Sequence, residues 1–155
     1  MQDQAKNFES LKTEIKEIIH SQSNRDEKLK IICQLLKDNV AYFDWVGFYL
    51  ADSAKKELLL GPYVGAPTEH TRILFGKGIC GQAAERKETF LIQDVSKQTN
   101  YLSCSPKVKS EIVVPIFKND EIIGQIDIDS HTISPFTQKD QKFLEDISKE
   151  LSKLF

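Results

Sequence analysis

Two pairs of β-prone stretches constrain this fold more than any other feature of the sequence. WVGFYLA (45–51) and ELLLGPYVG (57–65) are separated only by DSAKK, and EIVVPIF (111–117) and IIGQIDI (122–128) only by KNDE. Aromatic and β-branched runs joined by short polar breaks are typical of hairpins. The sequence therefore predicts a sheet built from antiparallel hairpins rather than from alternating βαβ units.

Helical periodicity flanks these hairpins. Apolar residues recur at helical spacing over 8–19, and a second apolar stripe runs over 25–39. Another helix is expected to start near Ile79 or Cys80, where glycines give way to helix-forming residues. The sequence Thr137–Asp140 has the form of a capping box, so it is predicted to open a C-terminal helix.

The remaining segments complete the predicted architecture. TFLIQDV (89–95) is expected to be a strand, and the polar stretch 96–110 a long loop with one helical turn. The predicted fold class is α+β, an antiparallel sheet flanked by helices. No linker or repeat divides the chain, so we expect one domain over 1–155. Its N-terminal helices would occupy about 1–40, and the motif-bearing sheet with the C-terminal helix about 44–155.

Composition excludes several classes of protein. The 155 residues carry a formal net charge of −2 with lysines scattered among acids, so no nucleic-acid surface is expected. Apolar runs are too short to span a membrane and no signal-like segment follows the polar start, which indicates a cytoplasmic protein. The three cysteines do not suggest a disulfide framework. His70, Cys80 and Cys104 match no compact zinc pattern, so neither a metal nor a cofactor is expected.

The second hairpin carries an unusual pair of acids. Asp127 and Asp129 are two residues apart on a predicted strand, so both carboxylates point to one face. Two-residue hairpin turns favour glycine and none is present, so we predict a three-residue loop at 119–121. That loop would pair Glu111 with Asp129 and Val113 with Asp127, and would gather three carboxylates on one face. A two-residue turn would instead leave Glu111 on the opposite face. The cluster is then either a solvated outer face or a polar pocket that needs negative charge.

Five motifs follow one another along the chain from Trp45 onward: WVGFYL, LGPYVG, TRILFGKGICGQAA, SEIVVPI and IIGQIDIDS. In this order they resemble the free methionine-(R)-sulfoxide reductases, which are single-domain GAF proteins. The resemblance covers most of the chain, and its specific parts are the glycine-flanked Cys80 and the SEIVVP/DIDS pair.

The resemblance implies an enzyme, an L-methionine (R)-S-oxide reductase, that converts free methionine-(R)-sulfoxide to methionine and is recharged by thioredoxin. The family's nucleophilic cysteine matches Cys104, seven residues before Glu111. A second family cysteine matches Cys80. The family's acidic trio matches Glu111, Asp127 and Asp129, which would supply a proton and bind the substrate's amino group. By analogy with other GAF domains, the C-terminal helix is also a candidate surface for a homodimer.

Two departures from the family pattern bear on how the oxidised nucleophile is restored. His70 stands where the family usually has a third cysteine, and the family's loop PGHIACD is replaced by TNYLSCSPK. Attack on a sulfoxide leaves Cys104 as a sulfenic acid, which condenses with a nearby thiol. We therefore expect Cys80 to resolve it, or an external thiol to reduce it directly.

Each singled-out residue also has a plain structural interpretation. Cys80 lies either at a helix start, where the dipole lowers a thiol pKa, or packed under a tight turn. Cys33 is expected in the core. Trp45 and Tyr49 share one face of a strand and would either pack in the core or form a pocket wall that binds the substrate methyl group. The alternative function is a non-catalytic GAF domain that binds and senses a small ligand.

Overall fold

The structure, a computed structural model, describes residues 4–102 and 105–155. Its elements follow in this order: α1 (Gln4–Ile19), α2 (Arg25–Asn39), β1 (Trp45–Asp52), β2 (Glu57–Val64), β3 (Arg72–Leu74), α3 (Gly78–Arg86), β4 (Phe90–Ile92), the 3₁₀ turn η1 (Val95–Lys97), β5 (Ser110–Lys118), β6 (Glu121–Ser130), α4 (Gln138–Leu151) and the 3₁₀ turn η2 (Ser152–Leu154). The predicted helices and both predicted hairpins are confirmed. The short strand β3 was not predicted.

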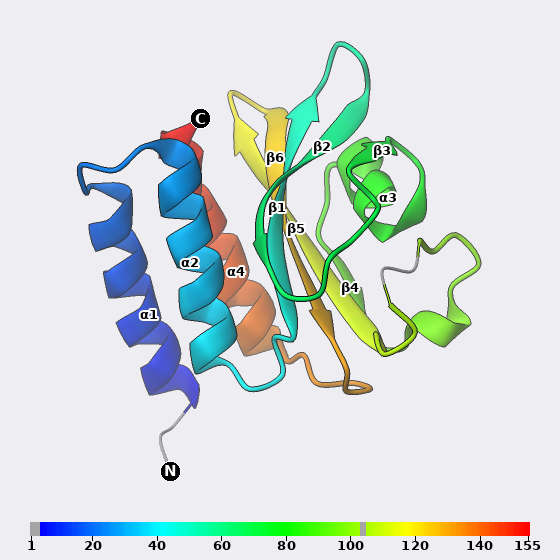
Figure 1. Ribbon diagram of the computed structural model, residues 1–155, viewed down its shortest axis with the longest axis horizontal. Helices are drawn as coiled ribbons and strands as arrows, with labels where there is room; N and C mark the ends of the chain where they lie inside the picture. Colours follow the sequence, from blue (N-terminus) through cyan, green and yellow to red (C-terminus); the bar gives the residue numbers. More distant parts are fainter. Residues whose placement is uncertain (1–3, 103–104) are drawn as a thin grey trace.

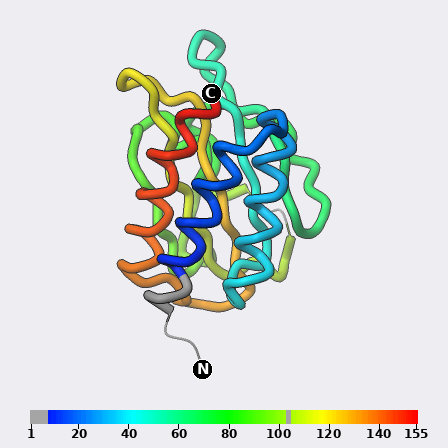
Figure 2. The backbone as a smooth tube through the Cα atoms, turned by 90° about the vertical axis from the view of Figure 1, so that its left-hand side faces the viewer, coloured from blue at the N-terminus to red at the C-terminus, as the bar shows by residue number. Residues whose placement is uncertain are grey.

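The six strands form one antiparallel sheet in the order β3-β2-β1-β6-β5-β4. β1 and β6 lie at the centre and join the two hairpins. Helices α1, α2 and α4 cover one face, and α3 lies on the other (Figure 1). Seen from the helical side, α1 runs between α2 and α4 (Figure 2), and it contacts both. The sheet thus separates a thick helical layer from a thinner layer around α3.

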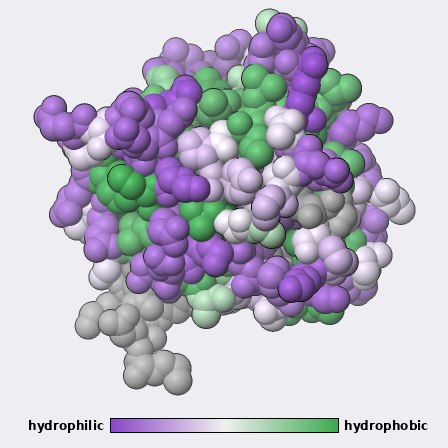
Figure 3. Space-filling view, viewed as in Figure 1, coloured by the Kyte–Doolittle hydropathy of each residue, from purple (hydrophilic) through white to green (hydrophobic). Residues whose placement is uncertain are grey.

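Each face of the sheet has its own hydrophobic cluster. Ile126 and Ile128 of β6 point toward α1, α2 and α4, and are fully buried there with Cys33, whose predicted core position is confirmed. Trp45, Tyr49 and their neighbours form a second cluster on the α3 side. Hydrophilic and hydrophobic side chains are intermixed over the outer face shown in Figure 3.

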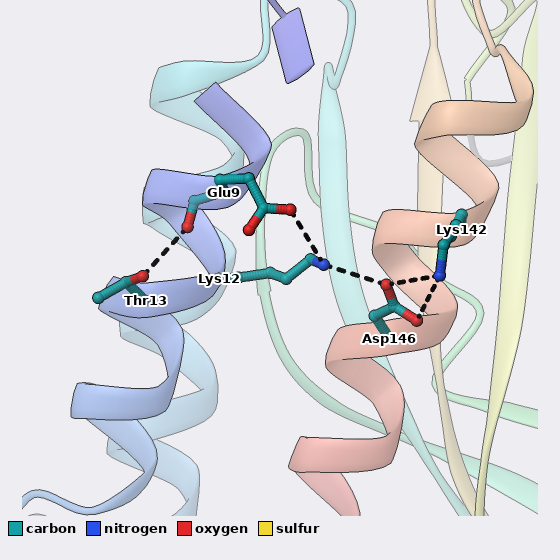
Figure 4. Close-up of polar contacts among 5 residues, drawn as sticks. All are labelled: Glu9, Lys12, Thr13, Lys142 and Asp146. Carbon is teal, nitrogen blue, oxygen red and sulfur yellow. Dashed lines mark hydrogen bonds and ion pairs between the residues drawn. The ribbon is translucent and has the colours of Figure 1, made fainter. Parts of the chain in front are cut away.

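Polar contacts hold the helical layer together. The Lys12 ammonium of α1 lies 3.1 Å from the Asp146 carboxylate of α4, which also pairs with Lys142 at 3.2 Å (Figure 4). The predicted capping box at the start of α4 is confirmed, because the Thr137 hydroxyl accepts from the Asp140 N–H while the Asp140 carboxylate accepts from the Thr137 N–H. Among the described residues, no helix is both long and apolar enough to cross a membrane.

The β5–β6 hairpin has the predicted register but not the predicted turn. Lys118 pairs with Glu121, so the turn has two residues, Asn119 and Asp120, both at positive φ (52° and 64°). Asn and Asp tolerate this conformation, so the turn forms without glycine and our three-residue loop was wrong. The register then shifts by one residue at a β-bulge, where Ile123 is the extra residue between the Phe117–Ile122 and Ile116–Gly124 pairs. The bulge restores the register that the longer loop would have produced.

Candidate active site

The restored register gathers the three acids. Glu111 lies directly opposite Asp129, and Val113 opposite Asp127, so all three carboxylates project from neighbouring strands toward α3. The predicted pairing is confirmed. Their side chains are buried, with residue exposures of 6% for Glu111 and 2% for each aspartate. A solvated outer face is therefore excluded, and the acids form a buried polar cluster.

Cys80 of α3 reaches this cluster from above the sheet. Its thiol donates to Glu111 Oε2 at an S···O distance of 3.8 Å. The ligand atoms of Cys80, Glu111 and Asp127 all lie within 4.8 Å of one another, a spacing that could surround a small cation. Gln125 lies on the same face of β6 as Asp127, and its amide nitrogen donates to the Cys80 carbonyl oxygen at 3.2 Å. The first turn of α3 is thus fixed to the acid-bearing strand.

Burial governs the protonation of this cluster. It raises the pKa of Asp127, and it raises the pKa of Asp129 well above the usual range, with the Asp127 charge adding to the second shift. Burial also raises the pKa of the Cys80 thiol, and the charges of Asp127 and Glu111 raise it further. Of the two interpretations of Cys80, this supports the residue packed under a tight turn rather than the thiol of lowered pKa. Burial and charge thus favour the neutral form of the Cys80 thiol and the protonated forms of Asp127 and Asp129.

Two carboxylate oxygens in the cluster lack a hydrogen-bond donor. Asp127 Oδ1 and Asp129 Oδ1 are buried and have no partner among the described residues. Burying an unpaired polar atom is unfavourable, and for an ionised oxygen more so. N–H donors or a positive charge placed beside these oxygens would therefore stabilise the cluster.

A small cavity opens onto the cluster. Its lining residues come from β1, the β2–β3 loop, β3, α3, the loop after η1, β5 and β6, and include Tyr49, His70, Cys80, Leu102, Glu111 and Asp127. The cavity volume is about 10 Å³, room for about one water molecule. The Tyr49 hydroxyl donates to the His70 carbonyl oxygen at 2.9 Å and thereby fixes the cavity wall.

The predicted site residues do not all lie at the cavity surface. Asp129 lies next to Glu111 but does not line the cavity. Trp45 is buried on the same side of the sheet, where its ring stacks on Tyr63 at a centroid distance of 5.2 Å and its indole N–H donates to the Ala66 carbonyl. Cys104 lies outside the described residues, so its role as nucleophile stays a prediction.

Sequence reasoning missed Gln125 and Leu102. Gln125 is fully buried, and it shares the face of Asp127 and Asp129 because all three are odd-numbered positions on one strand. The alternation that identified the aspartates could therefore have found it. Leu102 carries no local signal, because it enters the cavity wall through a loop.

Comparison with known proteins identifies relatives of this chain. Residues 24–154 match the GAF domain family. GAF domain-containing protein A of Dictyostelium discoideum is 38% identical over 144 residues, which make up 93% of this chain and 89% of the relative. Free methionine-R-sulfoxide reductase of Saccharomyces cerevisiae is 38% identical over 84% of this chain and 73% of its own length. This chain also superposes on the X-ray structure of free methionine-R-sulfoxide reductase from Neisseria meningitidis in complex with its substrate, with a TM-score of 0.93 and a sequence identity of 34%. The match covers 100% of this chain and 92% of that chain.

Proposed function

This chain belongs to the GAF-domain family and, within it, to the free methionine-R-sulfoxide reductases, and we propose that it reduces free methionine-(R)-sulfoxide to methionine. The observation that carries the proposal is the buried acid cluster with its two unpartnered carboxylate oxygens. A free amino acid carries an α-ammonium group, which is the cation these oxygens would accept. A methionine sulfoxide inside a peptide lacks that charge. The cluster therefore explains a preference for the free amino acid.

The chemistry needs a nucleophile and a proton. We propose that the Cys104 thiolate attacks the sulfoxide sulfur and forms an S–S bond. The protonated oxygen then moves from that sulfur to the cysteine sulfur as the S–O and S–S bonds to the substrate break, which leaves Cys104 as a sulfenic acid and releases methionine. A carboxyl group of raised pKa, Asp127 or Asp129, would protonate the sulfoxide oxygen. Glu111 and the remaining carboxylate would hold the ammonium group.

The sulfenic acid must then be reduced. One thiol condenses with Cys104 to give a mixed disulfide and water, and a second thiol releases Cys104 as a disulfide forms between the two reductant thiols. We propose that thioredoxin supplies these thiols in the cytoplasm, where thiols are kept reduced. Cys80 is the alternative first thiol. Its burial and raised pKa favour the external route, because the thiolate is the reactive form.

The proposed function is tested by methionine formation from each sulfoxide epimer, with thioredoxin, its reductase and NADPH supplied. We expect turnover of the R epimer only, loss of turnover in Cys104→Ser, and full turnover in Cys33→Ser. Cys33 is the matched control because it is buried in the helical layer and its pKa is raised to about 12. N-acetylmethionine-(R)-sulfoxide, which lacks the ammonium group, is expected to react poorly. Turnover that survives in Cys104→Ser would contradict the proposed nucleophile.

The second candidate function is a ligand-binding GAF domain without catalysis. The buried acids and their two unpartnered oxygens would equally suit a small amino-bearing ligand. Saturable binding of methionine sulfoxide in calorimetry without any methionine formation would favour this candidate. A homodimer through the outer surface of α4 also stays a prediction, which light scattering would test.

A further inference from the structure

The Asn100 side chain makes hydrogen bonds that have no part in the reaction proposed above. Asn100 lies three residues after η1, a turn that Figure 1 shows on the α3 side of the sheet. Its amide oxygen accepts from the Gly78 N–H at 2.8 Å, and its amide nitrogen donates to the Gly76 carbonyl at 2.7 Å. One side chain thus bonds both a donor and an acceptor of the turn that opens α3.

A second side chain reinforces this attachment. The amide nitrogen of Gln82, one turn into α3, donates to the Asn100 carbonyl at 3.0 Å and to the Gly78 carbonyl at 2.9 Å. Three hydrogen bonds therefore join Asn100 to Gly76, Gly78 and Gln82, which lie 18 to 24 residues earlier in the chain.

The attachment also completes α3. The first N–H groups of a helix have no partner within the helix, and a capping side chain normally satisfies one of them. Lys77 occupies the N-cap position of α3 and makes no side-chain capping hydrogen bond. Asn100 supplies the missing acceptor from another part of the chain.

The attachment fixes part of the cavity wall. Two residues after Asn100, the Leu102 side chain lies so close to Gly78 that a Cβ there would approach Leu102 Cγ to 2.9 Å. Gly78 also has a positive φ of 63°, so glycine is required on both grounds. Leu102 and Gly78 line the same cavity as Cys80 and Asp127. The loop therefore meets α3 at the edge of the acid cluster.

We propose that Asn100 is a positioning residue. It anchors its loop to the first turn of α3 and thereby fixes, beside the acid cluster, the point from which the chain continues toward Cys104. This inference rests on the proposed function, because Cys104 follows Asn100 by four residues. The acids that would bind the substrate are untouched by Asn100. Its loss should therefore affect the chemical step more than substrate binding.

The test compares two variants with a matched control. Asn100→Ala removes both side-chain hydrogen bonds and is expected to lower kcat by about 10- to 100-fold, because displacing a reacting group by about 1 Å has an effect of that size. KM is expected to stay within about threefold of its wild-type value. Asn100→Asp keeps an acceptor for the Gly78 N–H and should restore part of the lost kcat. Asn39→Ala, at the end of α2, removes the hydrogen bond of an exposed asparagine to the Leu35 carbonyl and should leave kcat unchanged.

A second readout separates this inference from the proposed function. The rate of iodoacetamide alkylation at Cys104, followed by peptide mass spectrometry, needs no turnover, and Asn100→Ala should change it at least about threefold while Cys33 and Cys80 stay unreactive. If the wild type has no reductase activity, the proposed function fails while alkylation still tests the anchor. An Asn100→Ala protein with wild-type kcat and a wild-type alkylation rate would overturn the inference. So would an equal fall in kcat in Asn39→Ala.

Discussion

Asp129→Asn is expected to stabilise the protein at neutral pH while abolishing its activity. Asp129 is 2% exposed, one of its oxygens has no partner among the described residues, and its pKa is raised well above the usual range by burial and by the Asp127 charge. Removing an unpaired buried charge should relieve about 2 kcal/mol, the middle of the range for an unsatisfied buried group. In a chain of this length that corresponds to a rise in Tm of about 4–8 °C.

The pH dependence of this effect follows from linkage. A carboxyl group whose pKa is raised by folding binds more protons in the folded than in the unfolded state, so wild-type stability falls as pH rises above the unfolded pKa of about 3.9. The amide that replaces the carboxyl group in Asp129→Asn cannot titrate. The stability difference between variant and wild type should therefore be small near pH 4 and should increase as pH rises through the raised pKa of Asp129.

Thermal melts followed by circular dichroism between pH 4 and 8 would measure this difference. The matched control is Asp140→Asn, because Asp140 is also fully buried but its carboxylate is hydrogen-bonded by Thr137 and Tyr42. That variant should melt below the wild type. The reasoning is refuted if Asp129→Asn melts at or below the wild-type temperature at pH 8, or if the difference between them is independent of pH.

Three other substitutions test separate parts of the structure. Cys80→Ser should keep more than about a third of the wild-type turnover with thioredoxin, because a buried thiol of raised pKa is a poor resolving group. If the variant instead turns over only once and stops with Cys104 oxidised, Cys80 is the resolving thiol. Asp146→Asn should lower Tm by about 1–4 °C by breaking the ion pairs between α1 and α4. Burial opposes the shift, but hydrogen bonds from Lys12 and Lys142 lower the pKa of Asp146. Its contribution to stability is therefore present above the unfolded pKa of about 3.9 and should be lost as the pH falls through the lowered pKa; an Asp146→Asn protein that melts at the wild-type temperature at low salt would contradict this. Asp120→Gly should stabilise the β5–β6 turn by about 0.5–1 kcal/mol in urea unfolding, because glycine adopts its positive φ without strain; a loss of stability would argue against this turn geometry.

The sequence predicted the elements whose signals are local. Helical periodicity located α1 and α2, and the capping box located α4, because apolar spacing and cap chemistry need no distant partner. Pairing of β1 with β6 was not predicted, since it joins segments about 80 residues apart and leaves no mark in either one. One domain over 1–155 stays a prediction, which the shared core of α1, α2, α4 and the sheet supports.

The candidate site shows the same limit. Alternation placed Asp127 and Asp129 on one face, and the register with Glu111 came out right through compensating features that the sequence did not reveal. The sequence left two interpretations of Cys80 open, because the helix start is a local influence whereas the burial and the facing carboxylates that raise its pKa depend on β5 and β6. Asn100 was missed because its partners are backbone groups of a distant turn.

The bulge at Ile123 decides which face of the sheet is occupied by the acids that follow it in β6. Side chains alternate along a strand, so if Ile123 were paired in the ladder like its neighbours, with the two-residue turn unchanged, Asp127 and Asp129 would face α1, α2 and α4 without any acidic residue being altered. Deleting Ile123 would instead keep both acids on the α3 side, because Gly124 would still pair with Ile116. The bulge thus absorbs one residue of hairpin length without reorienting the acids that follow it.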